Sequence, residues 1–331
     1  YNTFMGYKAG HGGTTSAPYS SGYDNVAVGY NALGNFTTGY SNTAIGKFAG
    51  DAINTGYNNT IMGESAGTSL TTGFGNVIIG RVAAYASTDV DKTVIIGEQA
   101  AYTGNMTSDA DGTVSIGSGA GKNITSGQKN VAVGFGALTL EDDGDFNTAI
   151  GYQALTNQEG KSGTVNNTAV GHRAGASMTS GHDATLVGSN AGAAITTGMY
   201  NTIIGSNAAD ALTTGDYNTA VGVHALSSED VGRGTTAIGY QSLYSQNSDS
   251  NDETTGNTAV GYESGYALTT GISNTIIGYD AGKTLTTTSN NVIIGREAGN
   301  DTAGSNAVII GSHAGDDNSP SNAVIIGYRA G

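Results

Sequence analysis

The sequence contains no cysteine and no tryptophan, 2 prolines, and 12 lysines and arginines against 27 aspartates and glutamates. Without cysteine, disulfide bonds and thiolate metal sites are excluded, and cysteine usage cannot indicate whether the protein works in an oxidising or a reducing compartment. The net charge of −15 argues against a nucleic-acid-binding surface or a polybasic membrane contact. No apolar run approaches the ~20 residues that a membrane-spanning helix needs. We therefore expect no nucleic-acid partner and no membrane insertion in this segment.

Glycine, in contrast, supplies 54 of the 331 residues. Many of these glycines close a short run rich in β-branched residues, as in Asn42-Thr43-Ala44-Ile45-Gly46. Of the 18 intervals between closing glycines, 12 are 17 residues long, two are 16 and four run from 20 to 23. Helix pairs and propeller blades need about 34 to 45 residues, whereas this period fits one solenoid coil. The sequence therefore predicts an all-β parallel β-solenoid of 19 coils, forming one domain over residues 1–331.

The residues around each closing glycine suggest which side of the coil is the interior. The residue before the glycine is always Ile, Val or Met, and the residue three before it is always Thr or Val. These two positions share one side of a strand because side chains alternate with period two. We expect that side to face the interior. An apolar residue seven after the glycine is expected to fill the core from the opposite wall, at Phe36, Ile53, Leu70, Ile124, Ile195, Leu212, Leu268 and Leu285.

The residue two before the closing glycine then faces outward. It is Ile, Leu or Phe in ten coils and Ala or Ser in the other nine. A contiguous apolar stripe in water usually marks an interface, so we expect this stripe to be buried between copies of the chain. The candidate interface residues are Ile61, Ile78, Ile95, Leu186, Ile203, Ile276 and Ile293.

Asparagine stands four before the closing glycine in 13 coils. Stacked coils bring such residues about 4.8 Å apart, where side-chain amides can bond along a ladder. A ligand-binding residue need not recur in most coils, so a structural ladder is the favoured interpretation. Its members include Asn25, Asn42, Asn59, Asn76, Asn130, Asn147, Asn201, Asn218 and Asn274.

The repeat resembles two known families of extracellular fibre. Segments such as Asn42–Gly46, followed by small residues and a glycine turn, resemble the head repeat of YadA-type trimeric autotransporter adhesins. Thr213-Thr214-Gly215, followed by Tyr217–Gly222, is similar to the shafts of phage tail-fibre-like proteins, which an endosialidase-type chaperone domain often follows. The resemblance covers essentially the whole chain and implies a left-handed β-roll that forms a homotrimer. The 17-residue repeat is longer than that of the adhesin heads, which implies a larger coil.

Four longer intervals between glycines indicate loop insertions, at His11–Ser21, Asn105–Gly112, Glu159–Val165 and Gln246–Thr255. Loops on a rigid scaffold often carry recognition, so the first and the last are candidate receptor contacts. The sequence begins and ends inside its repeat, and we therefore expect it to be a fragment of a longer fibre.

Tyrosine follows the closing glycine directly in seven coils. Exposed aromatic rows can stack on sugar rings, so Tyr30, Tyr240, Tyr262 and Tyr279 are candidate receptor contacts. The alternative is that these rings pack along the solenoid or between subunits.

Acidic clusters are the best candidates for chemistry, because paired carboxylates can cleave glycans. They occur at Glu141–Asp145 and Asp249–Glu253, without the aromatic-rich elaborations that a substrate cleft needs. Asp142–Asp145 or Asp109–Asp111 can be considered for calcium, but no recognised calcium-loop spacing is present. We expect solvated acidic turns, with no catalytic residue, metal or cofactor.

These features favour a non-enzymatic fibre or adhesin shaft, extracellular, on a cell surface or a virion. Its expected partners are copies of itself and a cell-surface glycan or protein receptor, bound through many weak contacts. A self-assembling extracellular filament subunit is the main alternative. An ice-binding solenoid and a glycan-cleaving tailspike are lesser alternatives. Thr pairs precede a turn glycine at Thr37-Thr38, Thr196-Thr197 and Thr269-Thr270, but adjacent residues point to opposite sides, so the pairs do not form a flat two-column Thr lattice.

Overall fold

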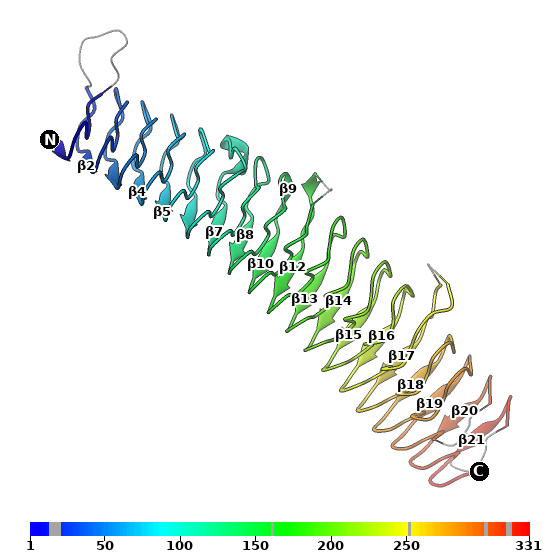
Figure 1. Ribbon diagram of the computed structural model, residues 1–331. Helices are drawn as coiled ribbons and strands as arrows, with labels where there is room; N and C mark the ends of the chain where they lie inside the picture. Colours follow the sequence, from blue (N-terminus) through cyan, green and yellow to red (C-terminus); the bar gives the residue numbers. More distant parts are fainter. Residues whose placement is uncertain (13–20, 160–161, 251–252, 301–303, 316–319) are drawn as a thin grey trace. The chain divides into compact units, whose positions relative to one another are not determined.

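The computed structural model of the chain describes residues 1–12, 21–159, 162–250, 253–300, 304–315 and 320–331. The chain divides into two compact units, Tyr1–Asn166 and Asn167–Gly331, and each is a stack of parallel coils (Figure 1). The predicted all-β parallel solenoid with a repeat of about 17 residues is confirmed. Among the described residues the one helical element is a 3-10 turn, η1 (Ser108–Ala110).

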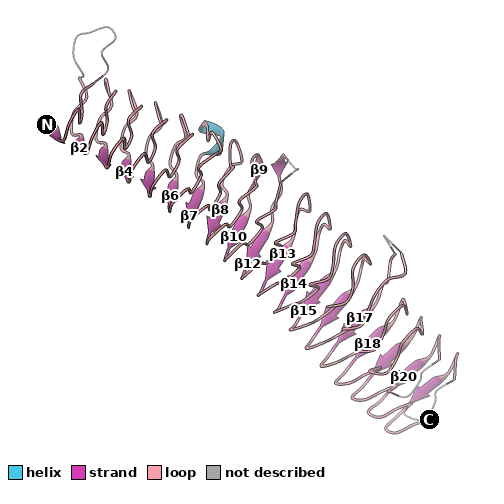
Figure 2. Cartoon of the chain, in the orientation of Figure 1, coloured by secondary structure: helices cyan, strands magenta, loops and turns pink. Residues whose placement is uncertain are grey.

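Each coil contributes one strand of three residues, and the rest of the coil is loop and turn (Figure 2). In the first unit these strands are β1 (Thr3–Met5), β2 (Val26–Val28), β3 (Thr43–Ile45), β4 (Thr60–Met62), β5 (Val77–Ile79), β6 (Val94–Ile96), β7 (Val114–Ile116), β8 (Val131–Val133) and β10 (Thr148–Ile150). In the second they are β12 (Thr168–Val170), β13 (Thr185–Val187), β14 (Thr202–Ile204), β15 (Thr219–Val221), β16 (Thr236–Ile238), β17 (Thr258–Val260), β18 (Thr275–Ile277), β19 (Val292–Ile294), β20 (Val308–Ile310) and β21 (Val324–Ile326). The short strands β9 (Gly144–Asp145) and β11 (Gly163–Thr164) pair with each other on the return side of the first unit.

Successive strands pair in parallel and in register, so equivalent residues of neighbouring coils form columns. Thr43 lies beside Thr60, for example, and Ile45 beside Met62. We number positions in a coil from its closing glycine, which is position 0, so that Ile45 is at −1 and Thr43 at −3 of the coil closed by Gly46.

The closing glycine is required by both conformation and space. Gly63, for instance, has φ +136°, and a Cβ built on it would lie 2.5 Å from the carbonyl oxygen of Gly80 in the next coil. A side chain at this position would therefore push neighbouring coils apart, and this explains why glycine recurs here in every coil.

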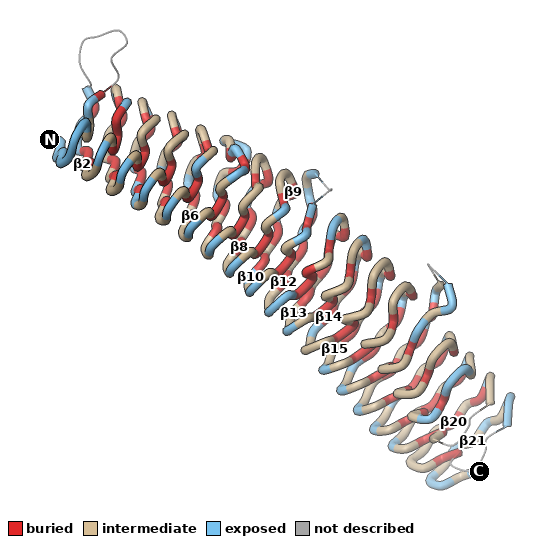
Figure 3. Tube along the Cα trace, viewed as in Figure 1, coloured by how far each residue is buried: buried red, intermediate tan, exposed pale blue. Residues whose placement is uncertain are grey.

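The interior of the coil lies on the opposite side of the strand from the one that the sequence suggested. In β2–β20 the middle residue of each coil strand, position −2, is buried, while positions −1 and −3 are half-buried or exposed (Figure 3). The prediction that position −2 forms an interface between copies is therefore wrong. The seven predicted interface residues are fully buried inside their own chain: Ile61, Ile78, Ile95, Leu186, Ile203, Ile276 and Ile293.

Core packing explains why position −2 varies in size. Position +4 also points inward, because a Cβ on Gly50 or Gly67 would contact the Ile61 side chain. Every coil with Leu at +4 has Ala at −2, as in the pair Ala220 and Leu226, whereas Ile203 is paired with Ala209. The two positions therefore share one space, which at most one large side chain of the coil occupies; where both are small, as at Ala44 and Gly50, Leu33 and Ile61 of the neighbouring coils lie close to it.

Position +7 closes the core from the other wall, as predicted. The eight apolar residues expected there, from Phe36 to Leu285, are all buried. Where +4 is Leu, +7 can instead be polar, as with Glu141, Gln158, Glu229 and Gln246, which are also buried. Glu141 accepts a hydrogen bond from the Gly144 amide at 2.6 Å, and Glu229 accepts one from the Gly232 amide at 2.7 Å. A carboxylate at +7 thus satisfies backbone donors of its own return turn.

The asparagine ladder is confirmed by its hydrogen bonds. The Asn59 amide nitrogen donates to Asn42 Oδ1 at 3.0 Å and to the Gly73 carbonyl at 2.8 Å. The Asn59 Oδ1 in turn accepts from the backbone and side-chain nitrogens of Asn76. Each ladder asparagine therefore joins its coil to both neighbours. The same pattern of bonds, in whole or in part, occurs at Asn25, Asn42, Asn76, Asn130, Asn147, Asn201, Asn218 and Asn274.

Of the four predicted insertions, the one at Asn105–Gly112 is described completely. It contains η1 and buries Met106 and Ala110 against the coil. The insertion at His11–Ser21 lies largely outside the described residues, as do residues 160–161 and 251–252 of the insertions at Glu159–Val165 and Gln246–Thr255.

Candidate functional site

The outward side of the strands carries an apolar column in each unit. Position −1 is occupied in every coil by Ile, Val or Met. The side chains of Met62, Ile150, Ile204, Ile238 and Ile277 are between 37% and 41% exposed. The other residues at −1 in β2–β20 are half-buried, and in-register pairing aligns them with the exposed ones, as Val221 lies beside Ile204. We call this column, with position −3 beside it, the outer strand face.

Position −3 adds a second column to the outer strand face. In the second unit it consists of seven successive threonines, all half-buried: Thr168, Thr185, Thr202, Thr219, Thr236, Thr258 and Thr275. The sequence reasoning assigned these threonines to the interior and so missed a regular row of hydroxyl and methyl groups. A signal was available, because Thr is costly to bury without hydrogen-bond partners and recurs there in consecutive coils.

The candidate receptor tyrosines are partly exposed and stack along the coils. Tyr240, Tyr262 and Tyr279 form one row, with ring centroids 5.2 and 5.0 Å apart, and Tyr30 stacks on Tyr7. Both faces of Tyr262 are thus covered, and Arg296 lies over the Tyr279 ring. Rings arranged in this way present edges and hydroxyls rather than faces to solvent, which disfavours sugar stacking in the middle of the row.

Polar groups fix the position of this tyrosine row. A hydrogen bond from the Tyr262 hydroxyl to the Glu263 carboxylate raises the pKa of Tyr262 to about 12. Glu263 also pairs with Lys283, which contacts Asp280 at 3.3 Å, and a hydrogen bond from Lys283 holds the pKa of Glu263 below its usual value. The row is therefore an ordered surface rather than a set of free aromatic side chains.

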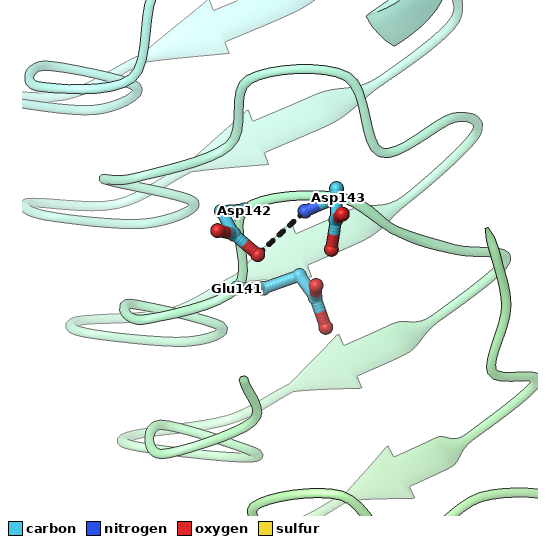
Figure 4. Close-up of side chains that lie close together, drawn as sticks. All are labelled: Glu141, Asp142 and Asp143. Carbon is cyan, nitrogen blue, oxygen red and sulfur yellow. Dashed lines mark hydrogen bonds between the residues drawn. The ribbon is translucent and has the colours of Figure 1, made fainter. Parts of the chain in front are cut away.

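The acidic turn at Glu141, Asp142 and Asp143 brings three carboxylates together (Figure 4). One oxygen of each lies within 4.8 Å of the others. Burial raises the pKa of Glu141 to about 7, although the Gly144 amide donates a hydrogen bond to it. Asp142 accepts a hydrogen bond from the Asp143 amide at 2.8 Å. These bonds organise the return turn, and they leave Glu141 facing backbone rather than an open cleft.

The other acidic candidates are not gathered into a comparable group within the described part of the chain. Asp111 accepts a hydrogen bond from the Asp91 amide at 2.9 Å, and Glu253 accepts one from the Asp249 amide at 3.0 Å. Asp142 and Glu159 line a shallow hollow of about 280 Å³ on the return side, with Thr103, Asn123 and Leu140.

No helix among the described residues is long and apolar enough to cross a membrane. Comparison of the chain with protein-family models, with curated proteins and with solved structures found no match.

Proposed function

We propose that the chain is a non-enzymatic shaft segment of an extracellular fibre or adhesin, located on a cell surface or a virion. Copies of the chain associate through the outer strand face. The assembled shaft then attaches to surfaces through weak contacts repeated along several chains, which together give avidity.

The observation that carries this proposal is the unbroken apolar occupancy of position −1. Within each unit, an apolar side chain stands at −1 in every coil, and some of these side chains have more than a third of their surface exposed, so each unit bears an apolar patch that a single chain leaves in water. Contiguous patches of this kind usually mark interfaces. A second copy suits the patch because it has the same coil spacing, so that each side chain at −1 meets an equivalent one at every step.

The resemblance of the repeat to YadA-type heads and tail-fibre shafts supports the same proposal and suggests three copies. It also suggests the extracellular location and a cell-surface glycan or protein as the receptor. The apolar strand face provides a physical basis for self-association that does not depend on the resemblance.

Molar mass in solution, measured by light scattering at several concentrations, tests the assembly. We expect a constant mass three times the 33.1 kDa of the chain. The triple variant Ile204→Asp/Ile238→Asp/Ile277→Asp should fall to the mass of one chain and keep its β circular-dichroism spectrum, because charges at −1 are accommodated by water but not by an interface. The matched control Thr197→Asp/Thr214→Asp/Thr270→Asp adds the same charge on the return turns and should keep the wild-type mass.

A wild-type mass of 33.1 kDa at every concentration would contradict the proposal. Mass that grows steadily with concentration would instead favour the self-assembling filament.

The seven-threonine column favours a second candidate, ice binding by the outer strand face. Hydroxyl and methyl groups repeat there about every 4.8 Å along a row, with an aliphatic column beside them. This candidate requires a free outer strand face, and therefore a monomer that shows thermal hysteresis. A stable oligomer without thermal hysteresis would dismiss it.

A further inference from the structure

One stretch of the first unit departs from the repeat at position +2. This position bears a side chain in every coil except two successive ones, where it is Gly119 and Gly136. A Cβ added to Gly119 would meet nothing within 4 Å, and one added to Gly136 would make only ordinary contacts. Packing therefore does not require glycine here, and the two glycines leave a gap in a column that is filled elsewhere.

The gap forms a hollow of about 290 Å³. Gln99 and Gln153 occupy +2 in the coils on either side of the two glycines, three coil steps or about 14 Å apart. Lys122, Thr139 and Thr156, all at +5, form one long wall. The volume lies just below the usual range for small-molecule sites, so the hollow suits a ligand of one or two rings.

Phe135 provides an aromatic face at this hollow. Its ring is 55% exposed and stacks on Tyr152 at a centroid distance of 5.4 Å, so one face is covered. The residue on its other side in the +1 column is Ser118, which is too small to cover a ring. In contrast to Tyr262, Phe135 therefore keeps one face free, and that face borders the gap above Gly119.

The polar groups around the hollow are available to a ligand. Among the described residues, the side chains of Gln99, Gln153, Lys122 and Thr156 make no hydrogen bond or ion pair, and the Thr139 hydroxyl donates to the Gly136 carbonyl at 2.8 Å. Amides and hydroxyls both donate and accept, as sugar hydroxyls do. The lining contains one cation and no carboxylate.

We propose that this hollow is a binding site for a saccharide, with one sugar ring against the free face of Phe135 and its hydroxyls bonded to Gln99, Gln153 and Lys122. An apolar ring face with polar groups around it matches the alternation of C–H faces and hydroxyl edges on a pyranose. A saccharide site would identify the class of receptor to which the proposed shaft attaches, and in that respect this inference rests on the proposed function. Sugar binding itself requires only the coils closed by Gly97, Gly117, Gly134 and Gly151.

The test uses the full chain and four probes: glucose, galactose, mannose and N-acetylglucosamine. Binding is measured by ligand-observed NMR and by titration. We expect at least one probe to bind with a Kd of about 1–10 mM, typical of a small ligand in an open site. The double variant Gly119→Asn/Gly136→Asn should weaken that binding at least about tenfold by filling the hollow, a loss of about 1.4 kcal/mol.

That variant should fold, because Asn31, Asn190 and Asn207 occupy position +2 in other coils with φ between 51° and 57°. Phe135→Ser should produce a similar loss by removing the ring. The matched control Asn190→Gly/Asn207→Gly opens an equivalent two-glycine gap in the second unit, between Arg173 and His224 and without an aromatic ring at +1. This control variant should bind sugar as the wild type does, without a second saccharide site.

Absence of binding by all four probes would overturn the proposal, and so would a Kd unchanged in the filled variant. Light scattering on the same samples separates this result from the assembly. An oligomer that binds none of the sugars would contradict only the proposed saccharide site. A monomer that binds a sugar would contradict only the proposed assembly.

Discussion

The strand side and the return side of each coil differ in how much the repeat allows them to vary. On the strand side, positions −3, −1 and 0 keep the same residue types in both units. On the return side the coil accepts insertions, and position +7 is apolar in some coils and polar in others. Aromatic stacks also change column there, from Tyr40 and Tyr57 at −6 to Tyr244 and Tyr266 at +5.

The physical reason is that the strand side is constrained from two directions. Its backbone must pair in register with both neighbouring coils, and we propose that its outward side chains also meet another copy of the chain. The return side also bonds to neighbouring coils, as the Asn54 amide does to the Thr71 carbonyl at 3.0 Å, but in our proposal no second chain packs against it. We therefore infer that the strand side mediates assembly and that the features distinguishing one stretch of the chain from another lie on the return side.

The largest effect should come from the shared core space that links the two sides. Leu226→Ala should cost about 2–5 kcal/mol by leaving a cavity, and Ala220→Ile about 1–3 kcal/mol by overpacking. The double variant should cost much less than the sum, because it recreates the arrangement of Ile203 with Ala209. Thermal denaturation of the four proteins gives the coupling energy. Additive effects would show that the two positions do not share space.

A smaller effect is expected where the strand begins. Asn59→Ala should cost about 1–3 kcal/mol, because it leaves the buried Gly73 carbonyl and Asn76 amide without partners. Asn59→Thr is the matched control and should cost less. At the equivalent position Thr93 donates its hydroxyl to Asn76 Oδ1 at 2.8 Å and so keeps one ladder bond. Equal melting temperatures for wild type and Asn59→Ala would show that the asparagine ladder does not contribute to stability.

The smallest effect should depend on pH and concerns the return side. Burial raises the folded-state pKa of Glu141 to about 7, above the usual 4.5, so the folded chain holds this proton more tightly than the unfolded chain. Stability should therefore fall as pH rises from about 4.5 to 7. Glu141→Gln should remove this dependence and gain on the order of 1–2 kcal/mol relative to wild type at pH 8. Melting temperatures from pH 4 to 8 measure it.

The exposed Glu159→Gln serves as the control, because it removes a charge without changing a buried group. If the difference between Glu141→Gln and wild type were the same at pH 4 and pH 8, the buried carboxyl would have no part in the pH dependence.

Much of the fold could be predicted from the sequence because repetition fixes period, pairing and register. The glycine spacing predicted the solenoid, the eight apolar residues at +7 predicted one wall of the core, and the recurrent asparagines predicted the ladder. Each of these inferences uses a residue type that a stacked coil favours at one position, glycine for its backbone conformation and the others for the environment of the side chain.

The two faces of the strand were inverted because alternation identifies two sides but does not say which is inside. The constancy of Ile, Val or Met at −1 suggested the core, yet a constant residue also suits an interface. The signal that identifies the interior is the size of the residues at −2 and +4: where one is large the other is small, as in Ala220 with Leu226 and in Ile276 with Gly282. The hollow at Gly119 and Gly136 was missed for a related reason, since it is a gap in a column rather than a motif.

The most direct test of the central proposal, that the outer strand face joins copies of the chain, uses the absence of native cysteine. The single variants Ile203→Cys and Ile204→Cys introduce a thiol at adjacent positions, one inside the coil and one on the outer strand face. Under mild oxidation, position 204 should form disulfide bonds between chains, and position 203 should neither cross-link nor react with a thiol reagent until the chain unfolds. Cross-linking through position 203, or through neither position, would contradict the account.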